Sequence, residues 1–359
     1  MLRNQKFLSI ILNKSSFCID EPIEGKIELN IISPTVISDI SLSVFFLENW
    51  LKISPVQEGD TFRDNLLTFN LNINKLLNIN TDLVSLAPGK YRFPFSFKIP
   101  KALSTSFEFS TPEKKAYIRY TIDAKIISPY IQGQTSNYIF INSKYKEKNV
   151  NNKPIKTSTI SIYKWNIVPE GTTTLKVSLL NDENYFQFGK AINFKVDIDN
   201  SIGKLITKEI KVVIIRKIDF KKNISREIVD SITNDCVVKK FKTLLKPGEK
   251  ESYIFEISLK DMDSNMFNDL KKANLPYTNL KELGFFLPNI QSAIIDCNYT
   301  FRATLYFDSF VAYKHRPRVF IPINICHLGR NDNQPDLNPL KGNNIDYTNN
   351  NNYQNIIKH

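Results

Sequence analysis

Short stretches of alternating apolar and polar residues recur along almost the whole chain. Residues 26–32 alternate through Ile27, Leu29 and Ile31, and residues 91–99 place their apolar side chains on one face in the same way. Because successive side chains of a strand point to opposite faces, this period of two predicts half-buried β-strands. A helical period is nearly absent, so the pattern favours an all-β fold.

The predicted strands form two groups with a polar, Asn- and Lys-rich break near residues 144–156. Strands are expected at 26–32, 39–47, 91–99, 117–127 and 138–141, and again at 174–180, 191–199, 209–215, 237–244, 251–259, 294–307 and 319–325. Turn residues such as Pro88-Gly89 lie between them. The pattern predicts two immunoglobulin-like β-sandwiches in tandem, at residues 1–155 and 156–327.

Two segments differ from the strand pattern. Residues 260–272 carry apolar residues at a spacing that fits either a short amphipathic helix or an ordered loop. Residues 328–359 are Asn-rich and almost without core residues, so we expect a disordered tail there.

The length of the chain indicates the number of domains, and its charge indicates the kind of partner. A chain of 359 residues suits two domains of ordinary size. Residues 1–155 carry 19 Lys and Arg against 14 Asp and Glu, and residues 156–326 carry 26 against 19, so the formal net charge of +12 belongs to the predicted domains. A basic body favours anionic partners, with a generic solvated surface as the alternative.

The cysteines and the N-terminus bear on the compartment. Cys18, Cys236, Cys297 and Cys326 are widely spaced, unlike a disulfide framework or a zinc site, which favours buried reduced thiols. The N-terminal apolar run is too short for a secretory signal, and no stretch approaches the roughly 20 apolar residues of a membrane span. We therefore expect a cytoplasmic protein.

Catalytic motifs are not found. The three histidines are His315, His327 and His359, and His315 lies in a basic run that indicates a surface position. Metalloprotease, hydrolase and phosphate-binding glycine motifs do not occur. Residues 261–272 begin like a calcium loop but lack its glycine and its final carboxylate. The expectation is a non-enzymatic protein without cofactor or metal.

Three basic clusters are the candidate binding residues. They are Arg216, Lys217, Lys221, Lys222 and Arg226 around a turn, Lys239, Lys240 and Lys242 along one strand, and Lys314, Arg316 and Arg318 before the last strand. Each cation near an anionic surface contributes about 1 kcal/mol, so these residues are candidates for anionic lipid or phosphate. The alternative for each cluster is a solubility face. Nucleic-acid binding is not expected, because the aromatics alternate within strands.

Residues 86–125 carry a more specific signal. They include L-A-P-G-K-Y-R-F-P-F-S-F-K-I-P, then S-F-E-F and Y-I-R-Y-T-I-D-A-K-I, which resembles the hallmark of the arrestin N-terminal domain. Pro94 requires an edge strand or a bulge, and Pro100 ends the ladder. Residues 185–201, with a Phe-Gly-Lys turn, are similar to the opening of the arrestin C-terminal domain. The resemblance extends over about residues 5–326.

The resemblance implies an adaptor that binds membrane-protein cargo or receptor tails and recruits trafficking or ubiquitination machinery. It implies a cytoplasmic protein that is peripheral at plasma or endosomal membranes. Asn142 stands near the place of the phosphate-sensing Arg of visual arrestins, so the chain resembles the alpha-arrestin or arrestin-domain-containing type more closely than visual or beta-arrestins. It lacks a Pro-Pro-x-Tyr motif for ubiquitin-ligase docking.

Two other functions stay open. The same fold would suit a retromer-type coat or sorting-complex subunit. A β-sandwich carbohydrate-binding module or enzyme is the alternative from another class, disfavoured by the missing catalytic residues and the missing secretion signal.

Overall fold

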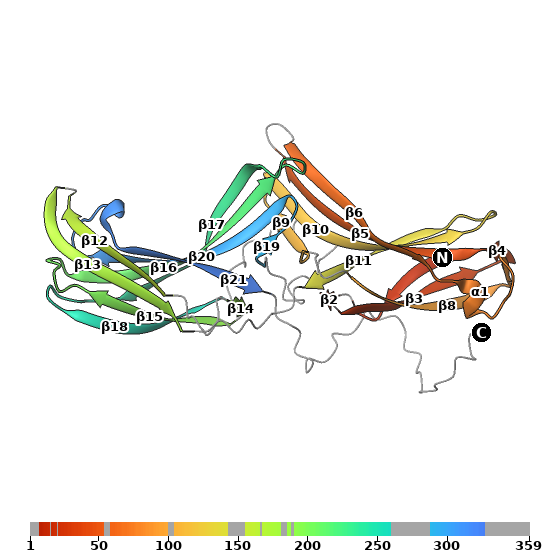
Figure 1. The fold of residues 1–359 in the computed structure, drawn as a ribbon, viewed down its shortest axis with the longest axis horizontal. Coiled ribbons are helices and arrows are strands. Elements are labelled where there is room, and N and C mark those ends of the chain that lie inside the picture. The colour runs from red at the N-terminus through yellow and green to blue at the C-terminus, as the bar shows by residue number, and fades with distance from the viewer. Residues whose placement is uncertain are drawn as a thin grey trace, which may run out of the picture.

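The computed structural model describes residues 7–14, 16–19, 21–53, 58–99, 104–142, 155–165, 167–180, 185–187, 190–259 and 288–326. Regular structure in these ranges is almost all strand, apart from the one-turn helix α1 (Ile73–Leu76) and the 3-10 turn η1 (Tyr313–His315). The strands form two groups that meet end to end (Figure 1). The predicted all-β fold of two tandem sandwiches is confirmed.

The first group, which we call the first domain, has two main sheets. The smaller sheet has the order β1-β3-β8, and the larger has the order β2-β11-β10-β5-β6 with β9 beside β10; β4 and β7 form a separate pair. The bounds are β1 (Leu8–Leu12), β2 (Ser16–Cys18), β3 (Pro22–Ile31), β4 (Thr35–Ile37), β5 (Asp39–Lys52), β6 (Glu58–Asn70), β7 (Val84–Leu86), β8 (Gly89–Lys98), β9 (Phe107–Ser110), β10 (Lys114–Ile127) and β11 (Gln134–Asn142).

The second group, the second domain, repeats this plan. Its smaller sheet has the order β12-β13-β15-β18, and its larger sheet has the order β14-β21-β20-β16-β17 with β19 beside β20. The bounds are β12 (Ile155–Lys164), β13 (Val168–Leu179), β14 (Tyr185–Gln187), β15 (Ala191–Asp199), β16 (Thr207–Lys221), β17 (Ile228–Lys242), β18 (Lys250–Ser258), β19 (Ile290–Gln291), β20 (Ile295–Phe307) and β21 (Arg318–Cys326). β14 runs parallel to β21 as β2 runs parallel to β11, so the alternating pattern occurs twice because the architecture does.

Alternation along each strand places one row of side chains in a core. In β5, Ile40, Leu42 and Val44 are fully buried, while the residues between them are partly exposed. Burial of a large apolar side chain stabilises a fold by about 1.5–3 kcal/mol. The same row of β5 continues through Glu48 and Trp50, which face the second domain.

Pro94 lies on a sheet edge, as predicted. β8 pairs with β3 at the end of the order β1-β3-β8, and Pro94 is opposite Lys26 in that ladder. A proline donates no hydrogen bond to a ladder, so it is tolerated where one side of the strand has no partner.

Several strands differ from their predicted extent. β16 continues to Lys221 and β17 begins at Ile228, because polar residues such as Asp219 and Ser231 bond to each other within that ladder. β6 and β12 were not predicted, since edge strands with a solvated face carry few apolar residues to form a pattern. Residues 260–272 and 328–359 lie outside the described residues.

Candidate functional site

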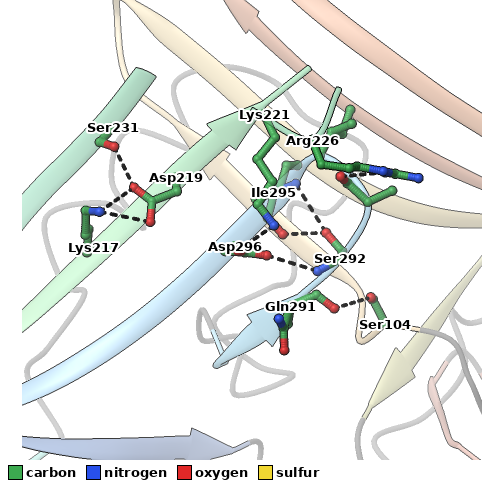
Figure 2. A network of polar contacts seen from close by, with 12 residues as sticks. Ser104, Lys217, Asp219, Lys221, Arg226, Ser231, Gln291, Ser292, Ile295 and Asp296 are labelled. Atoms are coloured by element: carbon green, nitrogen blue, oxygen red, sulfur yellow. Dashed lines mark hydrogen bonds and ion pairs between the residues drawn. The ribbon is translucent and has the colours of Figure 1, made fainter. Parts of the chain in front are cut away.

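The two domains meet where the ends of β5 and β6 approach the second domain's β16–β17 turn and the segment of residues 291–296. The segment joins β19 to β20, and Figure 2 shows its polar contacts. Ser104 Oγ donates to the Gln291 carbonyl at 3.3 Å, and Arg226 Nη1 donates to the Ala293 carbonyl at 2.6 Å. The first of these bonds joins the two domains, while the second holds the segment within the second domain.

Glu48 is at the centre of this contact. Its side chain is 0% exposed. Oε1 accepts hydrogen bonds from the backbone N–H groups of Ile294 and Ile295, both at 2.7 Å, and from the Ser292 hydroxyl, while Oε2 accepts from Ala293 N at 3.2 Å. Burial raises the pKa of Glu48, and these four hydrogen bonds oppose that rise. Successive backbone N–H groups of this kind form a concave site for an anion.

Trp50 adds an apolar part to the contact. Its side chain is 2% exposed, and its indole Nε1 donates to the carbonyl of Lys221 at 3.0 Å. The ring centroids of Trp50 and Phe220 lie 5.5 Å apart, and Phe109 approaches the other side of the same cluster at 6.5 Å from Phe220. A buried Trp contributes both area and a directed hydrogen bond, so it fixes the position of the β16 end.

Ionic and polar contacts surround Glu48 and Trp50. Lys114 Nζ lies 2.7 Å from Asp230 Oδ2 across the two domains. Asp60 Oδ2 accepts from the backbone N–H of Asn223 at 2.8 Å. A partly solvated rim of this kind is typical of contacts between domains of one chain.

We expect the Lys114–Asp230 pair to weaken in acid. Burial alone would raise the pKa of Asp230, but the Lys114 ammonium and the Ser231 N–H outweigh it and hold the pKa below its usual value. A lowered pKa means that the stabilisation is present above the unfolded-state pKa and is lost as pH falls through the folded-state pKa. An NMR titration of the Asp230 carboxyl carbon should show this shift, and Lys114→Met should raise the pKa of Asp230, because burial is then opposed by fewer contacts. Unchanged titration in Lys114→Met would contradict the assignment.

The first predicted cluster does not form a free basic surface. Arg216 is buried, on the inward row of β16. Lys217 pairs with Asp219, which also accepts from Ser231, and Lys221 lies 2.5 Å from Asp296 (Figure 2). Arg226 bonds within the domain contact, and Lys222 is exposed in the β16–β17 turn. Most of this cluster is therefore engaged within the second domain, next to the domain contact.

Lys240 and Lys242 of the second cluster and Arg316 and Arg318 of the third, by contrast, share one surface. Arg318 is opposite Thr304, Thr304 is opposite Lys211, and Lys211 is opposite Lys240, so one row crosses four strands. Directly opposed side chains of neighbouring strands lie close together on one face. Lys211 stands between the buried Ile210 and Val212, which places this row on the solvent side of the larger sheet.

We call this surface the basic face. It consists of Lys211, Lys240, Lys242, Arg302, Arg316 and Arg318. Two carboxylates offset part of the charge, since Lys240 pairs with Glu209 at 3.1 Å and Arg302 pairs with Asp235 at 3.7 Å. Lys239 and Lys314 are also exposed, but they lie outside the basic face. Lys239 is in register with the inward Val212, and Lys314 is in η1.

Exposed apolar side chains gather at the end of the second domain. We call this group the distal tip; it comprises Trp165, Ile167, Val168, Phe310 and Tyr313. Trp165 is 65% exposed, Ile167 is 80% exposed and Phe310 is 61% exposed. Trp165 N donates to the Phe310 carbonyl at 3.4 Å, which brings the β12–β13 turn to the segment after β20.

The distal tip and the basic face adjoin. The Arg318 guanidinium lies 3.9 Å from the centroid of the Tyr313 ring, and the Arg316 guanidinium lies 4.4 Å from that of Tyr306. Cations placed over aromatic rings in this way are attracted by the electrons of the ring. Apolar and cationic side chains therefore form one continuous surface.

The sequence prediction missed Glu48 and the distal tip. A signal for Glu48 was present, because a carboxylate at an inward position of an alternating strand is costly to bury without partners. For the tip, the signal was a Trp and β-branched residues at a turn between strands, where polar residues are usual.

Other features of the described residues concern metal ligands, membrane-spanning helices and thiols. Within them, no group of three or more His, Cys, Asp and Glu is arranged to hold a metal ion. No helix in the described ranges is long and apolar enough to cross a membrane. Cys297 is buried, while Cys18 and Cys236 are partly buried.

This geometry defines a class of proteins in which two β-sandwiches of one plan meet end to end. Residues 8–146 match the family model of the arrestin (or S-antigen) N-terminal domain, and residues 169–329 match that of the C-terminal domain. The chain belongs to the arrestin family, whose members are generally non-enzymatic adaptors. The resemblance seen in the sequence is confirmed.

One relative is similar to part of the chain. The chain is 26% identical over 140 residues to "Arrestin domain-containing protein 1" of Rattus norvegicus. The matched region is 39% of this chain and 32% of the relative, so the chain spans about a third of the relative's length.

Proposed function

We propose that this protein is an adaptor that works at the cytoplasmic surface of an anionic membrane, where it binds the tails of membrane proteins and recruits trafficking machinery. Membership of the arrestin family supports the adaptor role. The continuous surface formed by the distal tip and the basic face supports the membrane, and it is the observation that carries the proposal.

The two parts of this surface suit the two layers of a membrane interface. Each Lys or Arg near an anionic membrane contributes about 1 kcal/mol, and apolar side chains contribute through burial among the acyl chains. Neither part alone gives stable attachment, since peripheral proteins usually need two signals. In this protein the basic face and the exposed Trp165 and Phe310 supply both signals together.

Trp165 gives a direct measurement of this proposal. The chain has two tryptophans, and the other, Trp50, is buried at the domain contact. We expect vesicles containing anionic lipid to shift the emission of Trp165 to shorter wavelength, because its indole leaves water. The Trp165→Phe variant should lose the shift, and high salt should weaken binding through screening of the charges.

Charge variants locate the docking surface. The triple variant Lys211→Gln, Lys240→Gln and Lys242→Gln should weaken vesicle binding about tenfold or more. A matched triple variant in the first domain, Lys90→Gln, Lys98→Gln and Lys125→Gln, changes the net charge equally at exposed positions and should have little effect. Equal loss in both variants would indicate net charge alone, and absence of binding to any vesicle would overturn the membrane part.

A coat or sorting-complex subunit is the second candidate, favoured by the same fold. A stable stoichiometric complex on size-exclusion chromatography of the native protein would support it over transient binding of tails. Sugar binding or hydrolysis by the purified protein would instead support the carbohydrate-binding alternative.

A further inference from the structure

We infer that Glu48 is a latch that holds the two domains in one arrangement and that the contact opens and closes as a unit. Across the described residues, every hydrogen bond of the Glu48 carboxylate runs to the second domain. Its position in β5 is nevertheless inward, in the row of Phe46 and Trp50. The carboxylate therefore bonds to the other domain rather than to the sheet that carries it.

The physical basis is the cost of burying a charge. A carboxylate taken out of water is unfavourable unless donors replace its hydration. Here three successive backbone N–H groups and one hydroxyl replace it, and all four belong to residues 292–295. When the domains are docked, the Glu48 carboxylate and the four donors satisfy one another. When the domains separate, water solvates the carboxylate and the donors. A partly opened contact would give them neither kind of partner, so intermediate arrangements are disfavoured.

The groups around Glu48 fit a reversible contact. Lys221 is paired with Asp296 inside the second domain, and Arg226 bonds the carbonyl of Ala293, so these cations shape the segment without neutralising Glu48 directly. Lys114–Asp230 and Asp60–Asn223 N–H are among the polar contacts between the domains at the rim. These polar contacts can be exchanged for water, whereas the buried packing of Trp50 on Phe220 beside them becomes exposed when the domains separate and so favours the docked arrangement.

Amide hydrogen exchange tests the latch without lipid, so its result is independent of the proposed membrane function. In Glu48→Ala, we expect exchange of the Ala293, Ile294 and Ile295 amides to accelerate about 30-fold or more, the scale for removing one partner of a buried charged contact. The amides of Ile122 and Ile214, in the central strands β10 and β16, should keep their wild-type rates.

Two further variants separate the latch from a general loss of folding. Glu58→Gln changes an exposed carboxylate on the neighbouring strand β6 and should leave the three amides unchanged. Ser292→Ala removes one donor from the opposite side and should accelerate exchange of the Ala293 and Ile294 amides by a smaller factor. Ile295 is left out of this comparison, because its N–H also donates to the Ser292 hydroxyl. This variant decides the question if Glu48→Ala does not fold.

Two results would overturn the inference. One is unchanged exchange at Ala293 and Ile294 in Ser292→Ala, or at residues 293–295 in a folded Glu48→Ala. The other is equal acceleration at Ile122 and Ile214, which would make Glu48 a core residue of the fold. Small-angle scattering of Glu48→Ala should also show a broader distribution of interatomic distances, as expected for separated domains.

Discussion

Replacing Trp50 with alanine is expected to lower the free energy of unfolding by about 3–5 kcal/mol. The substitution removes a side chain that is 2% exposed and packed against Phe220, and it leaves the Lys221 carbonyl without the indole donor. Both losses occur at the junction of the domains. Urea unfolding followed by circular dichroism measures the change.

Two variants provide the comparison for Trp50→Ala. Trp50→Phe keeps much of the apolar contact but loses the hydrogen bond, so its cost should be nearer to about 1–2 kcal/mol. Trp165→Ala removes the exposed indole of the distal tip and should stay within about 0.5 kcal/mol of wild type. Similar costs for Trp50→Ala and Trp165→Ala would contradict the packing of Trp50 described above.

Replacing Arg119 with methionine should destabilise the first domain by about 3–5 kcal/mol near pH 8, because it leaves a buried carboxylate unpaired. Arg119 bonds Glu108 with two nitrogens, Nε to Oε1 at 2.5 Å and Nη2 to Oε2 at 3.3 Å. Glu108 is buried on β9, and the Arg119 guanidinium lies 4.0 Å from the centroid of the Tyr117 ring.

The Arg119→Met variant should also gain stability as pH falls. Burial raises the pKa of Glu108, and the hydrogen bonds and charge of Arg119 oppose that rise. Without Arg119 the folded-state pKa of Glu108 rises further above its unfolded value. A raised pKa means that the folded state binds the proton more tightly, so stability is greatest below the unfolded pKa and is lost as pH rises through the folded pKa.

Thermal unfolding at several pH values measures this effect. The double variant Arg119→Met with Glu108→Leu removes both charges, so it should recover much of the lost stability and lose the added pH dependence. If Arg119→Met showed the same pH dependence as wild type, the Glu108–Arg119 pair would not be the buried contact described here.

The strands whose inward row is apolar were predictable from the sequence. β15 begins and ends where the alternation of Ala191–Asp199 predicted, and β8 lies at an edge as Pro94 required. The exposed edge strand β6 was not predictable in this way, because polar side chains occur on both of its faces. The alternation of apolar and polar residues arises because one face of a strand is buried. A strand that buries few side chains therefore shows little alternation.

The basic residues show what the sequence could not decide. Lys217 and Arg316 carry the same charge and cannot be distinguished from the sequence. In the structure Lys217 is paired with Asp219 beside the domain contact, whereas Arg316 stacks on Tyr306 in the basic face. Arg216 is next to Lys217 in the chain and is buried. Whether a cation is available to a partner depends on its neighbours in space, which lie on other strands.

The sequence by itself determined the all-β class and the two tandem sandwiches, because these follow from a period of two and from local turn residues. The resemblance to arrestins rests instead on the motifs of residues 86–125 and 185–201. The tertiary structure decided that Lys240 and Arg318 share one face, that Trp165 approaches Phe310 and that Glu48 bonds to residues 292–295. Each of these pairs is distant along the chain. Register between strands and the docking of domains are set by the combined burial of many residues, and no local pattern encodes them.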